Sequence, residues 1–487
     1  MLAPFLIVTL AYGGVIVPRL NLILTLVCRQ YIAEREAVDP EFSMLPVIFG
    51  GQNPQCRIPE VQSRVATFML YMNFVTGILS AVTAPKIGAL SDRYGRTKLL
   101  VLTSCGTFVT EIIFVIAATR PEKFPIGVIL IGSAIDGLCG SFTAMMALAN
   151  SYASDTTTAH ERNVSFGFFH ACLFGGIAIG PILAGYLIKW TDSLASIFWT
   201  ASISHLVFIA FLAFVIPESL SKSRQMRARE HHERKRAQNP PSNDWLNQIR
   251  SFNFFEPLRI LWPTGPGTSS AVRRNLVALA AVDTIMFSVA MGAMTVVVIY
   301  TNFEFGWGTM EQSILVTVVN SCRVSCLVIV LPLLTRLVRG RASIRPSRTA
   351  GADALDLGLI RFAILVDILG YVGYSVVRTG PLFILSASIA SIGGLGSPTL
   401  QSALTKHVPP EKTGQLLGAT ALLHALARVG GPLTFNAIYA ATVGKFTQAV
   451  FVCLAATFGF ALIASLFIRP HGMLSLSIYI IRYTNIL

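Results

Sequence analysis

Long apolar runs recur along almost the whole chain, and they decide which folds are available to it. Each run is close to the roughly 20 residues that an α-helix needs to cross the hydrocarbon core of a bilayer. Inside lipid every backbone N–H and C=O group must be paired within the protein, so a series of such runs predicts a bundle of membrane-spanning helices. We expect twelve spans, at residues 2–28, 64–85, 98–118, 126–150, 163–188, 194–216, 275–300, 308–335, 358–378, 381–402, 413–438 and 446–468.

The composition agrees with a membrane protein and argues against nucleic-acid binding. Of the 487 residues, 53% are hydrophobic and 13% are charged, whereas a typical soluble domain has roughly 25% charged residues. The formal net charge is +14, but most Lys and Arg residues lie in short loops between the runs rather than on one binding surface. We therefore expect the lipid bilayer, and no nucleic acid, as a partner.

The eight cysteines do not predict a disulfide scaffold. Most lie inside apolar runs and are interpreted as small core residues. There is no CxxC pair and no Cys/His spacing typical of a metal site, so we expect neither metal nor cofactor. Cys28 and Cys56 border the first long polar segment, and both a disulfide and two free thiols are open interpretations there.

Basic segments fall on one side of the predicted bundle if every run spans the membrane. The segments 86–98, 220–274 and 336–357 are basic, whereas segment 29–63 balances its arginines with acidic residues. By the positive-inside rule, the basic segments and both termini are cytoplasmic. Plasma membrane and vacuolar membrane are both compatible with the sequence.

The long basic segment divides the chain in two. Its charge run, Lys222 to Arg236, is interpreted as a solvated linker, with attraction to anionic lipid headgroups as the alternative. The aromatic stretch that follows, Leu246 to Trp262, predicts a helix lying in the membrane interface. The expected units are a six-helix bundle at 1–219, the linker at 220–274, a second six-helix bundle at 275–470 and a tail at 471–487.

One polar loop, Gly88-Ala-Leu-Ser-Asp-Arg-Tyr-Gly-Arg-Thr-Lys98, is the most informative short motif; we call it the signature loop. It leaves little slack between two spans, so these two helices must be adjacent and antiparallel. Gly88 and Gly95 permit tight backbone paths. Asp92, Arg93 and Arg96 can pair with one another and with charges on other loops. The alternative is a basic loop placed only by the positive-inside rule.

The spacing of Gly, Asp and Arg in this loop resembles the signature between helices two and three of the major facilitator superfamily. The resemblance implies an all-α membrane protein with twelve transmembrane helices in two six-helix pseudo-repeat bundles, acting as a monomer by alternating access. An internal echo supports it, because Glu161-Arg162 precedes Gly180-Pro181 much as Glu411-Lys412 precedes Gly431-Pro432. The resemblance also implies a polar tail before the first span, and this sequence begins directly on the apolar run.

The resemblance assigns roles to residues around the fourth and fifth spans. Asp155, Glu161 and Arg162 are expected to contact Asp92 and Arg93, closing an inner gate whose charge pairs break and reform. The fifth span also resembles the glycine-rich motif of antiporters, because small residues let helices approach closely. Ordinary tight packing is the alternative interpretation of these residues, which are Gly176, Gly180, Pro181 and Gly185.

Ionisable residues inside the runs are functional candidates, because a charge in mid-membrane costs roughly 3 kcal/mol. By the resemblance, helices three, six, nine and twelve are peripheral, so Glu111, His205 and Asp367 are expected to be structural. The candidates for a proton and substrate pathway are Asp136, Asp283, Arg323, Arg428 and His424, with His170 as a further relay candidate. The carboxylates could take up a proton and the arginines could hold an anionic group; static buried pairs are the alternative.

The branch of the superfamily is indicated by weaker patterns. Drug:proton antiporters commonly carry Arg in an R-x2-Q-G pattern in span four, where this chain has Asp136 in Gly132-Ser-Ala-Ile-Asp-Gly-Leu-Cys-Gly140. Scattered positions, including Ser151-Tyr-Ala-Ser-Asp155, look more like the branch of proton-coupled folate transporters and their tetracycline-resistance-like fungal relatives. Pro217-Glu218-Ser219, after span six, is also common in fungal and drug-transporter branches.

These patterns together predict a secondary active transporter of a small organic solute, coupled to protons and working by alternating access. A drug:proton antiporter for multidrug efflux and a non-transporting sensor with the same fold are the alternatives. No nucleophile elbow, HExxH or P-loop motif is present, so we do not expect an enzyme. The substrate and the direction of transport stay open.

Overall fold

The computed structural model describes residues 1–38, 47, 54–56, 58–238, 255–264, 269–307, 309–339 and 351–470, and the regular structure within them is helical throughout. The helices of the first half are α1 (Leu2–Val38), α2 (Pro59–Tyr94), α3 (Arg96–Thr119), α4 (Gly127–Leu138), α5 (Ser141–Thr156), α6 (Arg162–Thr191) and α7 (Ala195–Phe214). Those of the second half are α10 (Ser270–Phe305), α11 (Thr309–Ser325), the π-helical η4 (Cys326–Val330), α12 (Leu331–Arg339), α13 (Ala354–Val376), α14 (Gly380–Ile392), α15 (Gly396–Thr405), α16 (Thr413–Thr442) and α17 (Ala449–Leu466).

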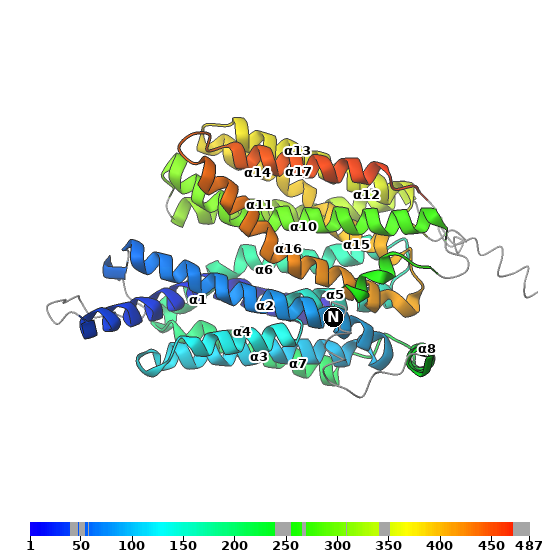
Figure 1. Ribbon diagram of the computed structural model, residues 1–487, viewed down its shortest axis with the longest axis horizontal. Helices are drawn as coiled ribbons and strands as arrows, with labels where there is room; N and C mark the ends of the chain where they lie inside the picture. The colour runs from blue at the N-terminus through cyan, green and yellow to red at the C-terminus, as the bar shows by residue number, and fades with distance from the viewer. Residues whose placement is uncertain are drawn as a thin grey trace, which may run out of the picture.

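The two halves form two bundles that lie side by side (Figure 1). Helices α1–α7 make the lower bundle of that view and α10–α17 the upper one, and their ribbons approach most closely at the right-hand end. Eleven spans in the described chain are long and apolar enough to cross a membrane. Helix α13 has 23 residues and packs against α14 and α17, so we count it as the twelfth.

Apolar side chains cover the outside of the bundles as well as their interior. Trp190, Phe214 and Leu369 are 84%, 88% and 64% exposed, respectively, in the isolated chain. A soluble protein rarely exposes such large contiguous apolar surfaces. Lipid is the solvent that accommodates them, so the chain is a multi-pass membrane protein.

Three spans depart from a continuous α-helix: the eighth contains the π-helical η4, and two others are broken more sharply. The fourth span is divided into α4 and α5 at Gly140, whose φ of 89° is left-handed and favours glycine. The tenth span is divided into α14 and α15 by a short 3-10 turn, Gly393–Leu395. The same helix of each half is therefore broken near its middle.

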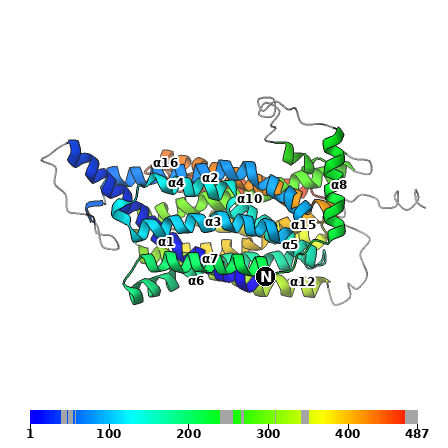
Figure 2. The same cartoon turned by 90° about the horizontal axis from the view of Figure 1, so that it is seen from below.

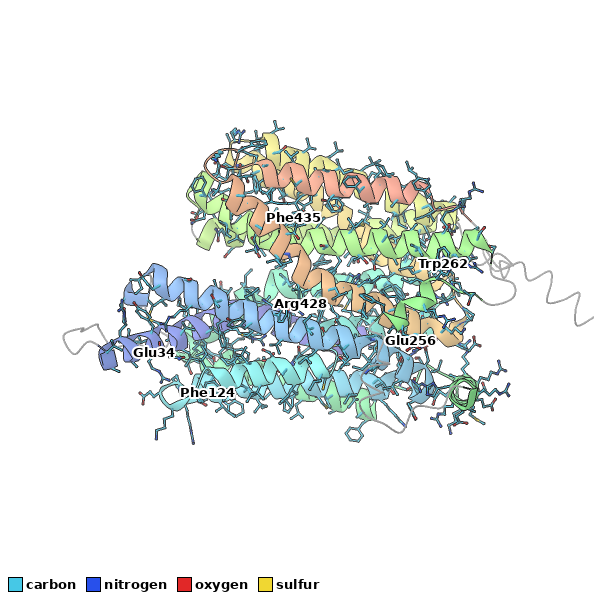
Figure 3. The ribbon with its side chains drawn as sticks, viewed as in Figure 1. Glu34, Phe124, Glu256, Trp262, Arg428 and Phe435 are labelled. Atoms are coloured by element: carbon cyan, nitrogen blue, oxygen red, sulfur yellow. A yellow bond between two sulfur atoms is a disulfide. The ribbon has the colours of Figure 1, made fainter. Side chains whose placement is uncertain are left out.

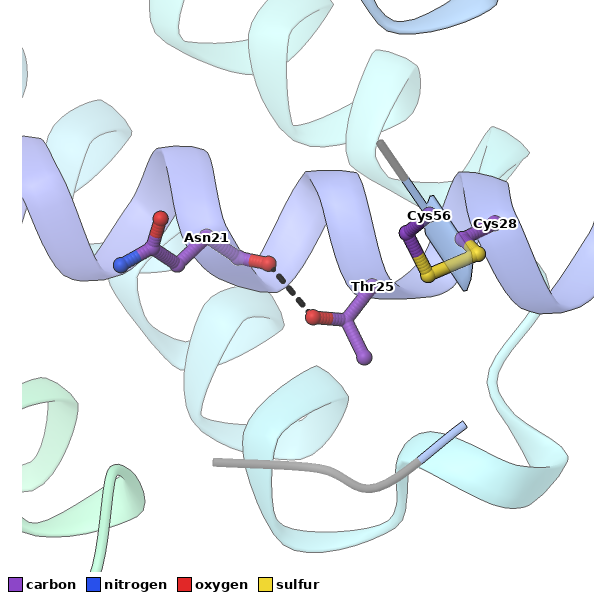
Figure 4. Close-up of a disulfide and its surroundings, with 4 residues drawn as sticks. All are labelled: Asn21, Thr25, Cys28 and Cys56. Atoms are coloured by element: carbon purple, nitrogen blue, oxygen red, sulfur yellow. Dashed lines mark hydrogen bonds between the residues drawn. A yellow bond between two sulfur atoms is a disulfide. The ribbon is translucent and has the colours of Figure 1, made fainter. Parts of the chain in front are cut away.

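A disulfide closes one end of the first bundle. Cys28 on α1 is bonded to Cys56, which lies in the short helix η1 (Pro54–Cys56) before α2 (Figure 4). The structure thus selects the disulfide of the two interpretations open from the sequence. At the same end, Arg64 on α2 and Glu34 on α1 form an ion pair at 2.5 Å. Most of segment 39–57 lies outside the described residues.

A basic helix lies across the opposite end. Helix α8 (Lys222–Gln238) runs roughly perpendicular to the bundle axes in Figure 2. Arg229 of α8 donates to the backbone oxygen of Arg93 at 2.9 Å, and its guanidinium lies 5.0 Å from the ring centroid of Tyr94. The predicted linker therefore contains a helix docked on the end of α2. The expected interfacial helix is described only from Phe255, as the short 3-10 helix η3 (Glu256–Leu261), and the tail lies outside the described residues.

Candidate functional site

The signature loop contacts the opposite bundle through Asp92. Only 5% of this residue is exposed, and its carboxylate oxygens accept hydrogen bonds from the backbone N–H groups of Gly414 (3.0 Å) and Gln415 (2.8 Å). These N–H groups belong to the first turn of α16, which has no intrahelical acceptors for them, and they form the positive end of its dipole. A side chain of the first bundle therefore caps a helix of the second.

Arg96, the first residue of α3, binds Asp92 from within the first bundle. Its side chain is completely buried, with Nη1 at 2.7 Å from Asp92 Oδ1 and Nε donating to Asp155 Oδ2 at 3.0 Å. Nη1 also donates to Ser91 Oγ at 2.6 Å. A buried guanidinium is tolerated when it is paired. These contacts tie α2, α3 and α5 together at this end.

Glu218 caps α3 and was not among the site residues expected from the sequence. Its carboxylate accepts from the backbone N–H groups of Arg96 (2.8 Å) and Thr97 (3.1 Å) and from Thr97 Oγ1 (2.8 Å). Gly95 has a φ of 105°, which favours glycine, and a Cβ there would also lie 2.3 Å from Glu218 Oε2. The Pro217-Glu218-Ser219 motif was visible in the sequence, but it did not reveal which helix the carboxylate caps.

Asp155 is the expected gate partner that joins the signature loop to the linker. Besides Arg96, its carboxylate has Ser219 Oγ at 3.3 Å from Oδ2 and Arg224 Nη1 at 3.7 Å from Oδ1. Arg224 belongs to α8. A buried carboxylate that is shared between α3 and α8 links the position of the basic helix to the gate.

The remaining gate residues are arranged differently from the expected cluster. Arg162 reaches the second bundle, where Nη1 donates to Thr405 Oγ1 at 3.5 Å. Glu161 accepts from Thr158 Oγ1 within its own loop at 3.1 Å. Arg93 donates to a carbonyl of its own helix and is the residue on which α8 docks. The expected pairing of these residues with Asp92 is therefore replaced by the helix cap on α16.

Two further hydrogen bonds cross between the bundles near this end. Asn150 Nδ2 on α5 donates to Gln401 Oε1 on α15, and both residues are buried. Asn163 Nδ2 on α6 lies 3.4 Å from Thr335 Oγ1 on α12. We call this interface between the two bundles the seam. Buried amides in it must find hydrogen-bond partners. These pairs hold the bundles together at the signature-loop end, where their ribbons also approach most closely (Figure 1).

The second half carries a buried ion pair at the corresponding place, with its charges exchanged. Lys406 Nζ, just after α15, lies 2.5 Å from Asp356 Oδ2 at the start of α13. In the first half the basic residue, Arg96, starts the third span and the acidic one, Asp155, is near the end of the fourth. The sequence did not reveal this pair, because the two residues lie 50 positions apart and the signs are reversed.

A neutral histidine adjoins that pair. His407 is buried outside the spans, with Nδ1 at 2.7 Å from the carbonyl oxygen of Ala403 and Nε2 at 3.3 Å from the side-chain amide nitrogen of Asn275. The first bond requires Nδ1 to donate and the second requires Nε2 to accept, which fixes the neutral tautomer. Burial, reinforced by the neighbouring Lys406, lowers the pKa of His407. Asn275 also binds both backbone groups of Arg469, at 2.8 and 3.1 Å.

The interior of the seam contains a carboxylate–imidazole pair. His424 Nε2 on α16 lies 2.9 Å from Asp283 Oδ2 on α10, and both residues are buried. The imidazole stacks on Phe287, with ring centroids 4.3 Å apart. From the first bundle, His170 Nε2 on α6 lies 3.5 Å from Ser397 Oγ on α15. Three ionisable side chains from both bundles therefore share this region.

Two arginines bring positive charge to the same region. Arg323 on α11 lies over the ring of Phe174 on α6, 4.6 Å from its centroid, and a Cβ at Gly394 would be 2.7 Å from its Cγ. Arg428 lies on α16 where that helix passes between the bundles (Figure 3). Within the described residues neither arginine forms an ion pair, and no set of three His, Cys, Asp or Glu side chains is placed to hold a metal.

Asp136 is placed inside the first bundle, against α3. Thr107 Oγ1 donates to Asp136 Oδ1 at 2.9 Å, and the carboxylate is partly exposed. This position separates Asp136 from the other pathway candidates. The structure brings Asp283, His424 and Arg323 together with His170 but does not add Asp136 to them.

Glycines of the fifth span pack against the first. Cβ atoms at Gly176 and Gly180 would lie 2.2 and 2.5 Å from backbone oxygens of α1, so the two backbones are in direct contact. Pro181 lies inside α6 without ending it, and Gly185 has no neighbouring atom within 4 Å of a Cβ. In the second bundle a Cβ at Gly431 would lie 2.4 Å from a backbone oxygen of α10. Each bundle thus contains close helix contacts that require glycine.

Known proteins resemble this chain over nearly its whole length. The MFS-type transporter avaJ of Aspergillus versicolor is 32% identical over 481 residues, covering 97% of this chain and 89% of the relative. The proton-coupled folate transporter of Rattus norvegicus is 23% identical over 402 residues, covering 81% and 77% of the two chains. Both resemblances agree with the family predicted from the signature loop.

The fold has a solved counterpart. The crystal structure of the human organic anion transporter MFSD10 (TETRAN) superposes with a TM-score of 0.69 at 17% identity, covering 95% of this chain and 97% of that one. A sequence model described as Major Facilitator Superfamily matches residues 63–432. Members of this family are transporters rather than enzymes. With its paired helical bundles, its signature loop and these relatives, the chain belongs to the major facilitator superfamily.

Proposed function

We propose that this protein couples the movement of a small organic anion to the movement of protons, by alternating access between its two bundles. The observation that carries the proposal is the buried Asp283–His424 pair, which lies beside the seam. A carboxylate and an imidazole 2.9 Å apart are coupled. A proton taken up by such a pair converts a carboxylate beside a neutral imidazole into an ion pair, so the charge of Asp283 is then compensated. The choice is supported by the folate transporter of Rattus norvegicus, a relative that is proton-coupled by name.

The arginines support an anionic substrate. Guanidinium groups keep their charge, and an unpaired one inside a membrane protein is costly unless something neutralises it. Neither Arg323 nor Arg428 forms an ion pair in the described chain, although Arg323 acts on the buried Asp367. Their helices, α11 and α16, contact α6 and α2 of the first bundle. A carboxylate or phosphate group on the solute would pair with these guanidinium groups through charge-assisted hydrogen bonds.

The orientation follows from the two ends of the bundle. The end with the signature loop and α8 carries the basic segments and is proposed to be cytoplasmic. The Cys28–Cys56 disulfide closes the other end, which suits an oxidising extracellular or lumenal space. The hydrogen bonds between the bundles at the signature-loop end then describe a state closed to the cytoplasm.

The test uses the purified full chain in sealed vesicles with an internal pH dye and a panel of small organic anions and lipophilic cations. We expect anion-evoked proton movement that is lost in Asp283→Asn. The comparison variant is Asp367→Asn, which removes another buried carboxylate, on α13, outside the Asp283–His424 pair; the charge that acts on it is that of Arg323, and proton movement should remain in place. Asp136→Asn tests whether the carboxylate against α3 also belongs to the path.

Each outcome of the panel has a distinct meaning. Proton movement with anions, in the direction of the solute, supports symport through Asp283. Proton movement only with cations, opposite to the solute, would replace the proposal with drug export. Proton movement that survives in Asp283→Asn would refute the role of the Asp283–His424 pair. If no probe evoked proton movement, although the chain was shown to be folded, a non-transporting sensor would be favoured.

A further inference from the structure

Helix α8 presents a basic surface at the signature-loop end of the bundles, and the proposed transport function does not use it. Its sequence, Lys222 to Gln238, contains seven Lys and Arg residues, two Glu residues and one large apolar residue, Met226. A helix that is polar all round is not held in place by burial of an apolar face. The charge of α8 therefore points to a partner outside the bundles.

The bundle contacts α8 on one side only. Arg224 Nη1 lies 3.7 Å from Asp155 Oδ1, and Arg229 donates to a backbone oxygen at the end of α2 at 2.9 Å. Arg227, which lies between these two residues in the sequence, is exposed, and so is Arg234. Residues seven positions apart lie on the same face of a helix. Two guanidinium groups of the face opposite the docked one are therefore free to meet a ligand from outside.

The orientation of α8 suits the headgroup layer of a membrane. The helix runs roughly perpendicular to the bundle axes in Figure 2, and it is seen end-on at the right-hand end of the first bundle in Figure 1. Because the bundle axes cross the membrane, a helix perpendicular to them lies parallel to the membrane plane. Its whole length is thus at one depth, beside the end of α2.

Aromatic side chains mark the same depth. Tyr94, over whose ring the Arg229 guanidinium lies, is exposed, and so are Phe255 and Trp262 on either side of η3. Trp262 lies at the end of the molecule that carries α8 (Figure 3). Tyr and Trp residues are enriched where a bilayer meets water. This end of the bundles therefore has the character of a membrane interface, with α8 lying in it.

We propose that α8 is a docking surface for the anionic lipid headgroups of the cytoplasmic leaflet. Lipid phosphate and carboxylate groups accept hydrogen bonds from Arg227 and Arg234, while Arg224 and Arg229 keep the helix on the bundle. Guanidinium groups bind such oxyanions through charge-assisted hydrogen bonds, and clustered Lys and Arg residues favour an anionic leaflet over a neutral one. The site depends neither on the identity of the solute nor on proton coupling.

The test uses the full chain in vesicles of phosphatidylcholine with about 30% phosphatidylserine. A fluorescent donor is attached at Met226→Cys, an exposed and uncharged position of α8, in a chain whose other free cysteines are replaced. It transfers energy to trace lipids that carry an acceptor on the acyl chain. The measured quantity is the association constant of phosphatidylserine at α8 relative to that of phosphatidylcholine.

We expect this ratio to exceed unity and to fall about fivefold in each of Arg227→Gln and Arg234→Gln. At about 1 M salt it should approach unity, because screening then acts over roughly 3 Å. Equal association of both lipids at low salt, or a preference that neither arginine variant changes, would overturn the proposal.

The matched controls are Glu230→Gln and Glu233→Gln, which neutralise exposed residues of the opposite charge on the same helix. Both should raise the preference for phosphatidylserine. Loosening of α8 would instead lower the preference in all four variants, and that result would refute a headgroup site. Asp283→Asn should leave the preference unchanged even if it abolishes transport, which separates this proposal from the proposed function.

Discussion

Asp92→Asn is the substitution that tests the cytoplasmic seam most directly. Asp92 makes two kinds of contact, a pair with Arg96 inside the first bundle and two hydrogen bonds to the first turn of α16 in the second. Only interactions that differ between the closed and the open state can shift the equilibrium between them. The Arg96 pair lies within the first bundle, so we expect it to persist in both states and assign the difference to the two bonds to α16.

The expected magnitude follows from those two bonds. Asparagine retains one carbonyl oxygen, which can accept one of them, so the substitution removes the second bond and the attraction between the charge and the helix dipole. A hydrogen bond to a charged group contributes about 1.5 to 3 kcal/mol. We therefore expect Asp92→Asn to weaken the closed state by about 2 kcal/mol, which corresponds to a roughly 30-fold change in the equilibrium.

The assay measures the distance between the bundles by electron–electron double resonance. Spin labels on Lys98→Cys and Lys412→Cys occupy exposed positions at this end, one in each bundle, in a chain whose other free cysteines are replaced. Asp92→Asn should shift the distribution toward longer distances. Glu218→Gln is the matched control, because this carboxylate also caps a helix N-terminus but does so within one bundle.

The control decides between a gate and general stability. If Asp92→Asn and Glu218→Gln changed the distances equally, the effect would come from loosening of the first bundle rather than from the seam. If Asp92→Asn left the distances unchanged, the two bonds to α16 would not hold the closed state. Either result would refute the reasoning above.

Three further predictions test other parts of the structure. A Cβ at Gly88 would lie 2.3 Å from a backbone oxygen of α16, so Gly88→Ala should separate the two bundles at this end, at a cost of about 1 to 3 kcal/mol. Gly185→Ala, at a position with open space around it, should leave the bundles in place. Equal spin-label distances in the two variants would contradict this. Replacing Cys28 and Cys56 by Ser releases residues separated by 28 positions and should destabilise the chain by about 3 to 4 kcal/mol, seen as a lower melting temperature that reductant no longer affects. Because burial lowers the pKa of His407, its contribution to stability should be complete above about pH 6.5 and decline as the pH falls. His407→Gln should flatten this part of the dependence of the melting temperature on pH. An unchanged slope would argue that another group titrates.

The spans were predictable because their signal is local. Length and apolarity alone identify a run such as 98–118, and the structure has a helix there, α3. The interrupted spans were less predictable, since the break in the fourth span depends on two consecutive left-handed residues, Gly140 and Ser141, inside an otherwise helical pattern. The signature loop predicted the family for a different reason, namely a fixed spacing of charges and glycines.

The partners of the site residues were harder to predict. Asp92 binds backbone N–H groups 322 and 323 positions away, and such groups carry no sequence signal of their own. The direction in which Asp136 faces was not predictable either, because the rotation of a helix about its axis is set by what packs on it. Lys406 and Asp356 were missed for a third reason, since the repeat preserves their places but exchanges their signs.

The close glycine contacts between helices have a mechanical consequence. At Gly176 and Gly180 the backbones of α6 and α1 are in direct contact, so neither helix can slide or turn without a steric clash. The two helices therefore move as one rigid unit. The fourth and tenth spans, by contrast, are interrupted, at Gly140 and at Gly393–Leu395, and can bend at these joints. If the bundles rock, the strain should concentrate in these joints, and substitutions there should change the rate of the conformational cycle more than its end states.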